Sequence, residues 1–319
     1  MKSASPFKTL LAAAVSVLAL GVANVSAAEA ESCGKVRFSD VGWTAETATT
    51  ATASFILKGL GYETEVTVLS VPVTYTSLSN KDIDVFLGNW MPTQEADIKP
   101  FRENGTVETV RENLEGAKYT LATNAKGAEL GIKDFADIAK QKDALGAKIY
   151  GTEPGNDGNR LIIDMVTSNK FELSGFEVVE SSEQGMLAEV ARAEQEGTPV
   201  VFLGWEPHPM NANFKLTYLT GGDDIFGPNF GRATVYTNVR QGYTTECPNV
   251  GKFLANLKFS LEMENQIMGK ILNDGQDPEA AATDWLKANP AAIEPWLAGV
   301  TTKDGSGEAL PAAKTALGL

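Results

Sequence analysis

The sequence contains few of the residues that most catalytic and metal-binding sites use. Its 319 residues include a single histidine and only two cysteines. One histidine leaves little room for a histidine-based zinc site or a serine–histidine–aspartate relay. Basic residues are also fewer than acidic ones, 27 against 41, so the formal net charge is −14. This balance argues against nucleic acid as a partner, because phosphate binding requires a basic surface.

The remaining composition is typical of a globular protein. Hydrophobic residues make up 43% and charged residues 21% of the chain, which excludes a disordered protein. The length suits two domains of roughly 150 residues each. Beyond residue 27 no stretch reaches about 18 apolar residues, so we expect a soluble protein without a membrane-spanning helix.

The first 27 residues have the pattern of a secretory signal peptide. Lys2 and Lys8 form a positive start, residues 10–23 are nearly all apolar, and residues 25–27 form a small-x-small cleavage site. We predict cleavage near Ala27 and export of the rest of the chain to the periplasm.

Export to an oxidising compartment favours a disulfide between Cys33 and Cys247, with two free thiols as the alternative. The two residues are 214 positions apart, and chain-entropy models give roughly 5 kcal/mol for closing so long a loop. The bridge would bring an N-terminal strand close to the start of a late helix. We therefore expect the chain to leave one domain and return to it.

Short apolar segments alternate with helical patterns along the chain. Strands are predicted at 35–39, 65–70, 83–87, 106–110, 120–122, 148–150, 199–203 and 234–237. Helices are predicted at 46–60, 135–140, 159–168, 185–196, 250–260, 262–272 and 278–289. This alternation predicts an α/β fold with mostly parallel sheets.

Three tryptophans stand just beyond the carboxyl ends of predicted strands. Trp43, Trp90 and Trp205 each have a glycine within the two preceding residues. Ligands of open α/β sheets bind outside these strand ends, so the rings are placed to meet in one cleft, with Tyr119 as a fourth wall. Aromatic faces attract cations, and a cage of such rings suits a quaternary ammonium group.

Other aromatic and polar motifs are less informative. Any single tryptophan can be a core residue, and Trp285 and Trp296, which lack the strand-end context, are interpreted as packing residues. The glycine-rich loop 151–158 is not a P-loop, but its Asn156 suits a ligand hydroxyl; a structural turn is the alternative. His208 is interpreted as a loop residue, and no metal or cofactor site is predicted.

Long segments of the chain resemble periplasmic substrate-binding proteins of ABC importers, in the glycine betaine/choline branch and closest to its choline-binding members. They include FSDVGWT, VPVTYTSLSNKDIDVFLGNWMPT, YGTEPGNDGNRLI and VFLGWEPHPMN, and the similarity runs from about residue 32 to the C-terminus. The resemblance implies a type II fold, with two domains of mostly parallel sheets flanked by helices and a ligand cleft between them. Domain I is expected at 32–117 and 226–319, and domain II at 118–225.

The resemblance also implies the site residues. The aromatic box would consist of Trp43, Trp90, Tyr119 and Trp205. Asn156 would contact the polar end of the ligand. The choline-binding members are expected to carry an acidic residue two positions after the first box tryptophan, where this chain has Ala45 followed by Glu46. Either Glu46 reaches the cleft, or the hydroxyl relies on Asn156, or the ligand differs; as an alternative, Glu46 is a first-turn acid favoured by the helix dipole.

We therefore expect a monomeric periplasmic binding protein, not an enzyme, that captures choline and delivers it to an inner-membrane ABC permease. Three alternatives stay open: glycine betaine or another quaternary amine as the main ligand, an exported choline-ester hydrolase that depends on His208, and a purely structural exported protein.

Overall fold

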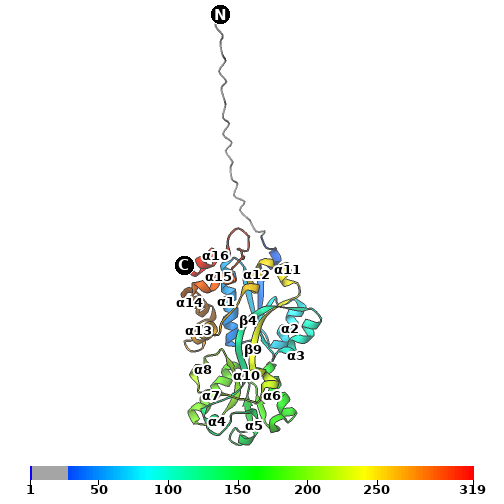
Figure 1. The fold of residues 1–319 in the computed structure, drawn as a ribbon, viewed down its shortest axis with the longest axis vertical. Helices are drawn as coiled ribbons and strands as arrows, with labels where there is room; N and C mark the ends of the chain where they lie inside the picture. The colour runs from blue at the N-terminus through cyan, green and yellow to red at the C-terminus, as the bar shows by residue number, and fades with distance from the viewer. Residues whose placement is uncertain (2–27) are drawn as a thin grey trace.

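The computed structural model describes Met1 and residues 28–319, so the predicted signal peptide lies outside the described residues except for Met1. Two lobes lie one above the other, and the strands β4 (Val107–Thr123) and β9 (Arg232–Arg240) connect them (Figure 1).

Each lobe combines short strands with surrounding helices. The upper lobe contains β1 (Lys35–Asp40), β2 (Glu63–Val68), β3 (Val85–Met91), α1 (Thr44–Gly59), α2 (Val71–Asn80), α3 (Glu95–Glu103), α11 (Tyr243–Glu246), α12 (Pro248–Asn256), α13 (Leu261–Leu272), α14 (Pro278–Ala288), α15 (Ile293–Trp296) and α16 (Ala309–Leu317). The lower lobe contains β5 (Lys148–Tyr150), β6 (Glu177–Val179), β7 (Val201–Glu206), β8 (Thr217–Tyr218), α4 (Ala125–Glu129), α5 (Phe135–Ile138), α6 (Asp157–Thr167), α7 (Glu183–Glu196), α8 (Met210–Asn213), α9 (Asp223–Phe226) and α10 (Pro228–Gly231). The predicted domain boundaries, 117/118 and 225/226, remain a prediction.

The strands form one curled, mixed sheet in the order β2-β1-β3-β9-β4-β7-β5-β6, with β8 on β4. The α/β class is confirmed. Parallel pairing holds between β1 and its neighbours and between β5 and its neighbours, but every pairing of β4 and β9 is antiparallel. The sheet is therefore less parallel than expected, because one connecting strand leaves the upper lobe and the other returns to it.

The strand β4 replaces two predicted strands, 106–110 and 120–122. Its pairing with β9 shifts register three times between Thr109 and Ala117. Such irregularities bend a strand and interrupt its alternation of buried and exposed residues, which is why the pattern between the two predicted pieces gave no strand signal.

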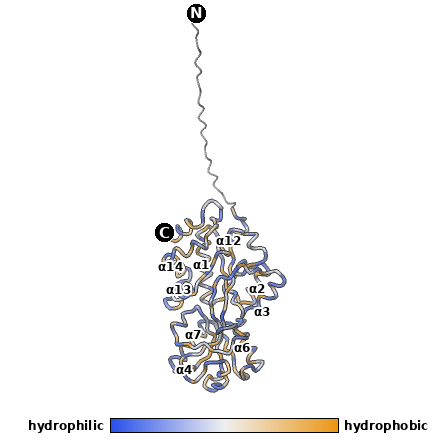
Figure 2. The backbone as a smooth tube through the Cα atoms, in the orientation of Figure 1, coloured by the Kyte–Doolittle hydropathy of each residue, from blue (hydrophilic) through white to orange (hydrophobic). Residues whose placement is uncertain are grey.

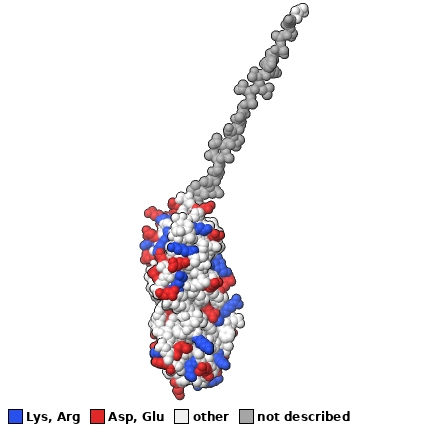
Figure 3. Space-filling model, turned by 90° about the vertical axis from the view of Figure 1, so that its left-hand side faces the viewer, with Lys and Arg blue, Asp and Glu red and all other residues white. Residues whose placement is uncertain are grey.

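Apolar strands form the core of both lobes. In β3 and β7 the segments 85–87 and 201–203 are at most 2% exposed, as continuous apolar runs covered on both faces require. Figure 2 shows the apolar residues concentrated along the central strands, while the outer helices are largely hydrophilic. On the face drawn in Figure 3 acidic and basic side chains are interspersed. Within residues 28–319 no helix is both long and apolar enough to cross a bilayer.

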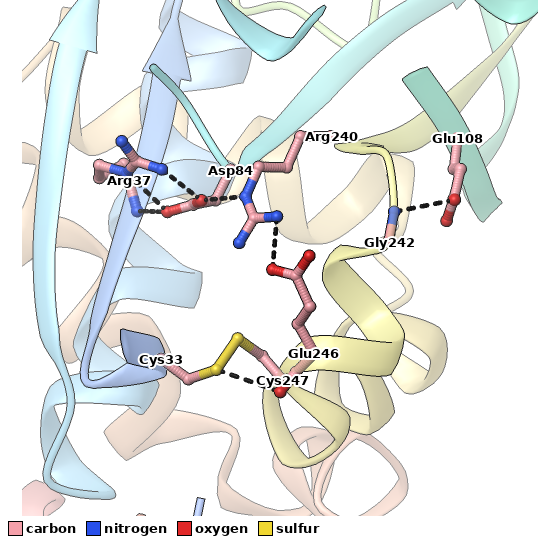
Figure 4. A network of polar contacts seen from close by, with 8 residues as sticks. All are labelled: Cys33, Arg37, Asp84, Glu108, Arg240, Gly242, Glu246 and Cys247. Atoms are coloured by element: carbon pink, nitrogen blue, oxygen red, sulfur yellow. Dashed lines mark hydrogen bonds and ion pairs between the residues drawn. A yellow bond between two sulfur atoms is a disulfide. The ribbon is translucent and has the colours of Figure 1, made fainter. Parts of the chain in front are cut away.

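The predicted disulfide is confirmed: Cys33 and Cys247 are bonded, with their Cα atoms 5.6 Å apart (Figure 4). Beside the bridge, the carboxylate of Asp84 accepts hydrogen bonds from Arg37 at 2.8 and 2.9 Å and from Arg240 at 2.7 Å. Arg240 in turn pairs with Glu246 at 2.7 Å. Burial alone would raise the pKa of Asp84, but the two guanidinium groups hold this pKa below its ordinary value.

Candidate ligand-binding site

A cavity of about 340 Å³ lies between the two lobes, walled mainly by aromatic rings. Its lining residues are Trp43, Ala45, Trp90, Tyr119, Thr152, Asn156 and Trp205. The four rings come from four separate segments: the residue before α1, and the strands β3, β4 and β7. The structure thus brings the four predicted box residues and Asn156 to one place, and no charged side chain of the described residues lines it.

The rings stand at steep angles to one another, as the walls of a cage do. The Tyr119 ring lies 6.2 Å from Trp90 and 6.3 Å from Trp205, with interplanar angles of 66° and 81°. All four rings are only 6–8% exposed. Because the negative face of a ring attracts a cation, rings in this arrangement suit a compact cation that makes contact on several sides.

A close approach between strand and helix fixes the position of Tyr119. The Tyr119 hydroxyl donates to Asn156 Oδ1 at 2.9 Å. It also lies against the backbone of Gly158, where a Cβ atom would overlap the hydroxyl, so only glycine allows this contact. Asn156 caps α6 by accepting from Asn159 N at 3.1 Å, and its amide therefore has a fixed orientation beside the cavity.

Two polar contacts near the cavity join the upper lobe to the lower. The Trp43 indole N–H donates to Glu153 Oε1 at 2.9 Å. The first turn of α1 is bound by Glu183, which accepts from both the backbone N–H, at 2.9 Å, and the hydroxyl of Thr44. Thr44 lies between two cavity residues, so both contacts hold the upper wall of the cavity against the lower lobe.

The single histidine takes part in the second of these contacts. His208 Nδ1 accepts from Met210 N at 3.0 Å, so Nε2 carries the proton and donates to Glu183 Oε1 at 3.2 Å. The histidine ring also packs edge-on against Trp205, with centroids 4.9 Å apart. His208 does lie in a loop, as predicted, but it is only 2% exposed and supports both a box ring and the Glu183 contact.

A third contact between the lobes is a bidentate ion pair farther from the cavity. Arg160 of α6 bonds both carboxylate oxygens of Asp97 of α3 at 2.8 Å and also donates to the Thr93 carbonyl at 3.3 Å. The planar fork of arginine matches a carboxylate in this way. These polar contacts, together with a hydrogen bond of 3.0 Å from Asn213 to Asn273, connect the two lobes.

The structure does not bring Glu46 to the aromatic cavity. Its neighbour Ala45 lines the cavity, whereas the Glu46 carboxyl lies behind it, accepting from Leu87 N at 3.3 Å and from the Thr50 hydroxyl at 3.4 Å. Burial, together with nearby Asp40, raises the pKa of Glu46 well above its ordinary value.

Sequence reasoning missed three residues around the cavity. Thr152 lines it, and Glu153 holds Trp43; both belong to the glycine-rich loop that the sequence marked out, so the loop itself was the signal. The third residue is Glu183, whose carboxylate bonds Thr44 and His208. It is 1% exposed, and nothing local distinguishes it, because its partners Thr44 and His208 are distant in sequence.

The chain is similar to transport proteins with known structures. The family model described as the substrate-binding domain of ABC-type glycine betaine transport systems matches residues 34–288. A solved ABC-transporter choline binding protein in complex with choline is 78% identical, with a TM-score of 0.90 over 91% of this chain and all of that one. An unliganded semi-closed structure of an ABC-transporter choline binding protein, also 78% identical over the same shares, has a TM-score of 0.84. The glycine betaine/carnitine transport binding protein GbuC of Listeria monocytogenes is 30% identical over 51% of this chain and 55% of that protein.

Proposed function

This chain belongs to the family of substrate-binding domains of ABC-type glycine betaine transport systems, and we propose that it captures choline and delivers it to an ABC permease. The observation that carries the proposal is the cavity walled by Trp43, Trp90, Tyr119 and Trp205. A quaternary ammonium group has no N–H to donate, so ring faces are its natural partners. Each desolvated ring contributes about 1–2 kcal/mol, and four rings support roughly micromolar binding after the cost of association.

The polar end of the cavity favours choline over glycine betaine. A betaine carboxylate needs strong donors, but the cavity offers only Thr152 and Asn156 as polar lining. The two nearby donor side chains are already engaged: the Arg160 guanidinium is bound to Asp97, and the His208 Nε2–H donates to Glu183. A choline hydroxyl needs a single polar partner. Asn156 Oδ1 already accepts from Tyr119 and Asn159, and one N–H of Asn156 Nδ2 donates to Glu153, so the second N–H of Nδ2 provides this partner. The solved structure with 78% identity that is described as a choline binding protein supports the same order.

Family members bind transport substrates, and we propose that this chain carries no catalytic activity of its own. A choline-ester hydrolase would need a free general base within reach of a nucleophile. Both nitrogens of the only histidine, His208, are occupied by Glu183 and by the Met210 N–H. This arrangement suits a positioning role rather than proton transfer.

Substrate-binding proteins of this family lie outside the cytoplasmic membrane. We propose that this chain is periplasmic, that it is cleaved near Ala27, and that it acts as a monomer. In that compartment the confirmed bridge between Cys33 and Cys247 is the expected state of the two thiols.

Titration calorimetry of the purified protein tests the ligand assignment with three compounds: choline, glycine betaine and 3,3-dimethylbutanol, the uncharged isostere of choline. We expect choline to bind with a micromolar dissociation constant, betaine more weakly, and the isostere at least tenfold more weakly than choline. Tighter binding of betaine would reverse the order of ligands. Equal binding of the isostere would exclude the aromatic box as a cation site.

A further inference from the structure

A second cavity, of about 200 Å³, adjoins the aromatic one in the upper lobe. The two cavities share Ala45 and Trp90 as walls. The far side of the second cavity has a different character, because two carboxyl groups, Glu46 of α1 and Glu264 of α13, line it together with the amide of Asn113. A single methyl group and one indole ring therefore separate the predicted cation site from two buried acids.

Glu264 faces this cavity without a partner. It is 3% exposed, and across the described residues its carboxyl makes no hydrogen bond or ion pair; its backbone N–H donates to the Ser260 carbonyl. Burial alone raises the pKa of Glu264 to about 8. An unpaired buried carboxyl is costly when it is ionised, so a residue of this type calls for an explanation.

Glu46 is held in place on the opposite wall. It is 3% exposed and accepts its two long hydrogen bonds from Leu87 and Thr50. A Cβ atom at residue 88 would overlap its carboxyl, so Gly88 is required for the group to lie there. The backbone of β3 thus shapes the pocket around this acid.

The charges facing the pair are all negative. Besides Glu46 and Glu264 themselves, Asp40 of β1 is close enough to raise the pKa of Glu46. The remaining lining residues come from α1, β3, β4 and β9 and are uncharged: Ala45, Thr49, Leu87, Trp90, Asn113, Leu114 and Val235. No lysine, arginine or histidine among the described residues lines this cavity, so nothing compensates an ionised carboxyl from within the protein.

We propose that Glu46 and Glu264 determine the net charge of the ligand, favouring net-cationic over zwitterionic quaternary amines. The inference rests on the proposed function. A permanent cation in the aromatic box lies just beyond Ala45 and Trp90, where it stabilises one ionised carboxyl across a medium of low polarity. The carboxylate in turn stabilises the cation, and the proton that leaves the carboxyl passes to solvent.

A zwitterion produces no such effect, because the carboxylate of the ligand opposes the field of its own ammonium group. The aromatic cavity itself has no charged residue among its described lining residues. In this chain the negative charge therefore lies behind the box wall, in a second layer that the ligand does not touch.

Calorimetry in buffers of different ionisation enthalpy, phosphate and Tris, tests the proposal. Choline cannot gain or lose a proton at the ammonium group, so any buffer dependence of the binding enthalpy reports on the protein. At pH 8, where a carboxyl with a pKa of about 8 is half protonated, we expect release of about 0.3–0.5 proton per choline. Glycine betaine should release almost none, and choline affinity should rise between pH 6 and pH 9.

The variants Glu264→Gln and Glu46→Gln remove one charge each while keeping the shape of the side chain. We expect each to abolish most of the proton release and to lower the ratio of choline affinity to betaine affinity by about fivefold or more. Glu262→Gln, at an exposed acid on the same helix, is the matched control and should change neither quantity. Two variants are used so that poor folding of one leaves the other informative, and thermal unfolding checks both.

The outcomes separate this inference from the proposed function. Choline binding without proton release, together with an unchanged affinity ratio in both glutamine variants, would overturn the role of the pair and leave the choline site standing. Proton release that persists in both variants would assign it to another acid, such as buried Asp157 of α6, whose pKa burial raises to about 7, and would also overturn the inference. No binding of choline at all would overturn both proposals.

Discussion

Two carboxyl groups of the upper lobe, Asp84 and Glu264, are equally hidden from water but have opposite surroundings. Their residues are 2% and 3% exposed. Asp84 accepts hydrogen bonds from two arginines beside the disulfide (Figure 4), and its pKa is lowered. Glu264 lines the second cavity, its carboxyl has no hydrogen-bond partner among residues 28–319, and burial raises its pKa to about 8. The two acids therefore differ in whether the fold places positively charged side chains beside them.

The difference indicates what each end of the lobe is built for. Pairing a buried acid with two guanidinium groups satisfies its charge within the protein, and removing one partner of such a group is strongly destabilising. An unpaired buried acid lowers the stability of the fold at high pH. The same acid can stabilise a cationic ligand that binds beside it. The disulfide end of the lobe therefore serves the fold, and the cavity end serves the ligand.

The largest effect is expected at the disulfide end. Asp84→Asn removes the negative charge that Arg37 and Arg240 share, so Arg37 loses its acidic partner and Arg240 keeps only Glu246. We expect the free energy of unfolding to fall by about 3–5 kcal/mol, measured by urea denaturation, while choline affinity of the folded protein stays unchanged. Asp82→Asn, at an exposed acid two residues earlier, is the control. A loss below about 1 kcal/mol would remove the contrast between the two acids.

The next effect concerns the dependence of stability on pH. Because the pKa of Glu264 rises from an ordinary 4.5 to about 8 on folding, the folded protein binds the proton more tightly than the unfolded chain between these values. Stability is therefore lost as pH rises through this window. Glu264→Gln should remove the loss, stabilising the protein by about 4 kcal/mol more at pH 9 than at pH 5 relative to the wild type.

Asp84 has the opposite effect on the pH dependence of stability. Its lowered pKa contributes stability that is present above its ordinary value of 3.8 and is lost as pH falls through the folded value. Unfolding midpoints measured from pH 3 to pH 9 should thus decline at both ends. Parallel pH profiles for the wild type and Glu264→Gln would contradict the assignment of the alkaline decline to Glu264.

Substitutions in the box sharpen the comparison from the ligand side. Trp43→Ala, Trp90→Ala and Trp205→Ala each remove one ring of the cavity, and we expect choline affinity to fall at least tenfold in each case. Trp285→Ala, at a half-buried helix residue outside the cavity, should leave affinity unchanged. Calorimetry on variants whose circular dichroism matches the wild type provides the measurement; unchanged affinity in all three would exclude the cavity as the ligand site.

The smallest expected effect comes from Ala45→Asp, which adds a negative charge to the wall of the box. We expect choline to bind about three- to tenfold tighter, because the hydroxyl gains an acceptor and the cation gains a neighbour of opposite charge. Ala45→Asn supplies an acceptor without charge and separates the two contributions. Unchanged or weaker binding by the aspartate variant would mean that the hydroxyl already has its acceptor.

The sequence predicts those parts of the site that leave a local signature. Trp43, Trp90 and Trp205 each follow an apolar strand and a glycine, and this context was enough to expect them in one cavity. Glu183 and Glu264 carry no such signature, because only long-range packing brings their helices to α1. Likewise β4 was divided in two because its register shifts interrupt the pattern of a single strand.

The order of strands in the sheet has a consequence for folding when the N-terminal part of the chain becomes available first. In the upper lobe β3 pairs with β9, so the edge exposed by the first 91 residues stays open until residues 232–240 arrive. The strands β5, β6 and β7 of the lower lobe pair with one another and with the earlier β4, and need nothing that comes later. Long-range pairing of this kind is slow and leaves apolar edges open to aggregation. The upper lobe, which contains the first strands of the chain, is therefore the last to complete its sheet. A chaperone would be needed most by these N-terminal strands.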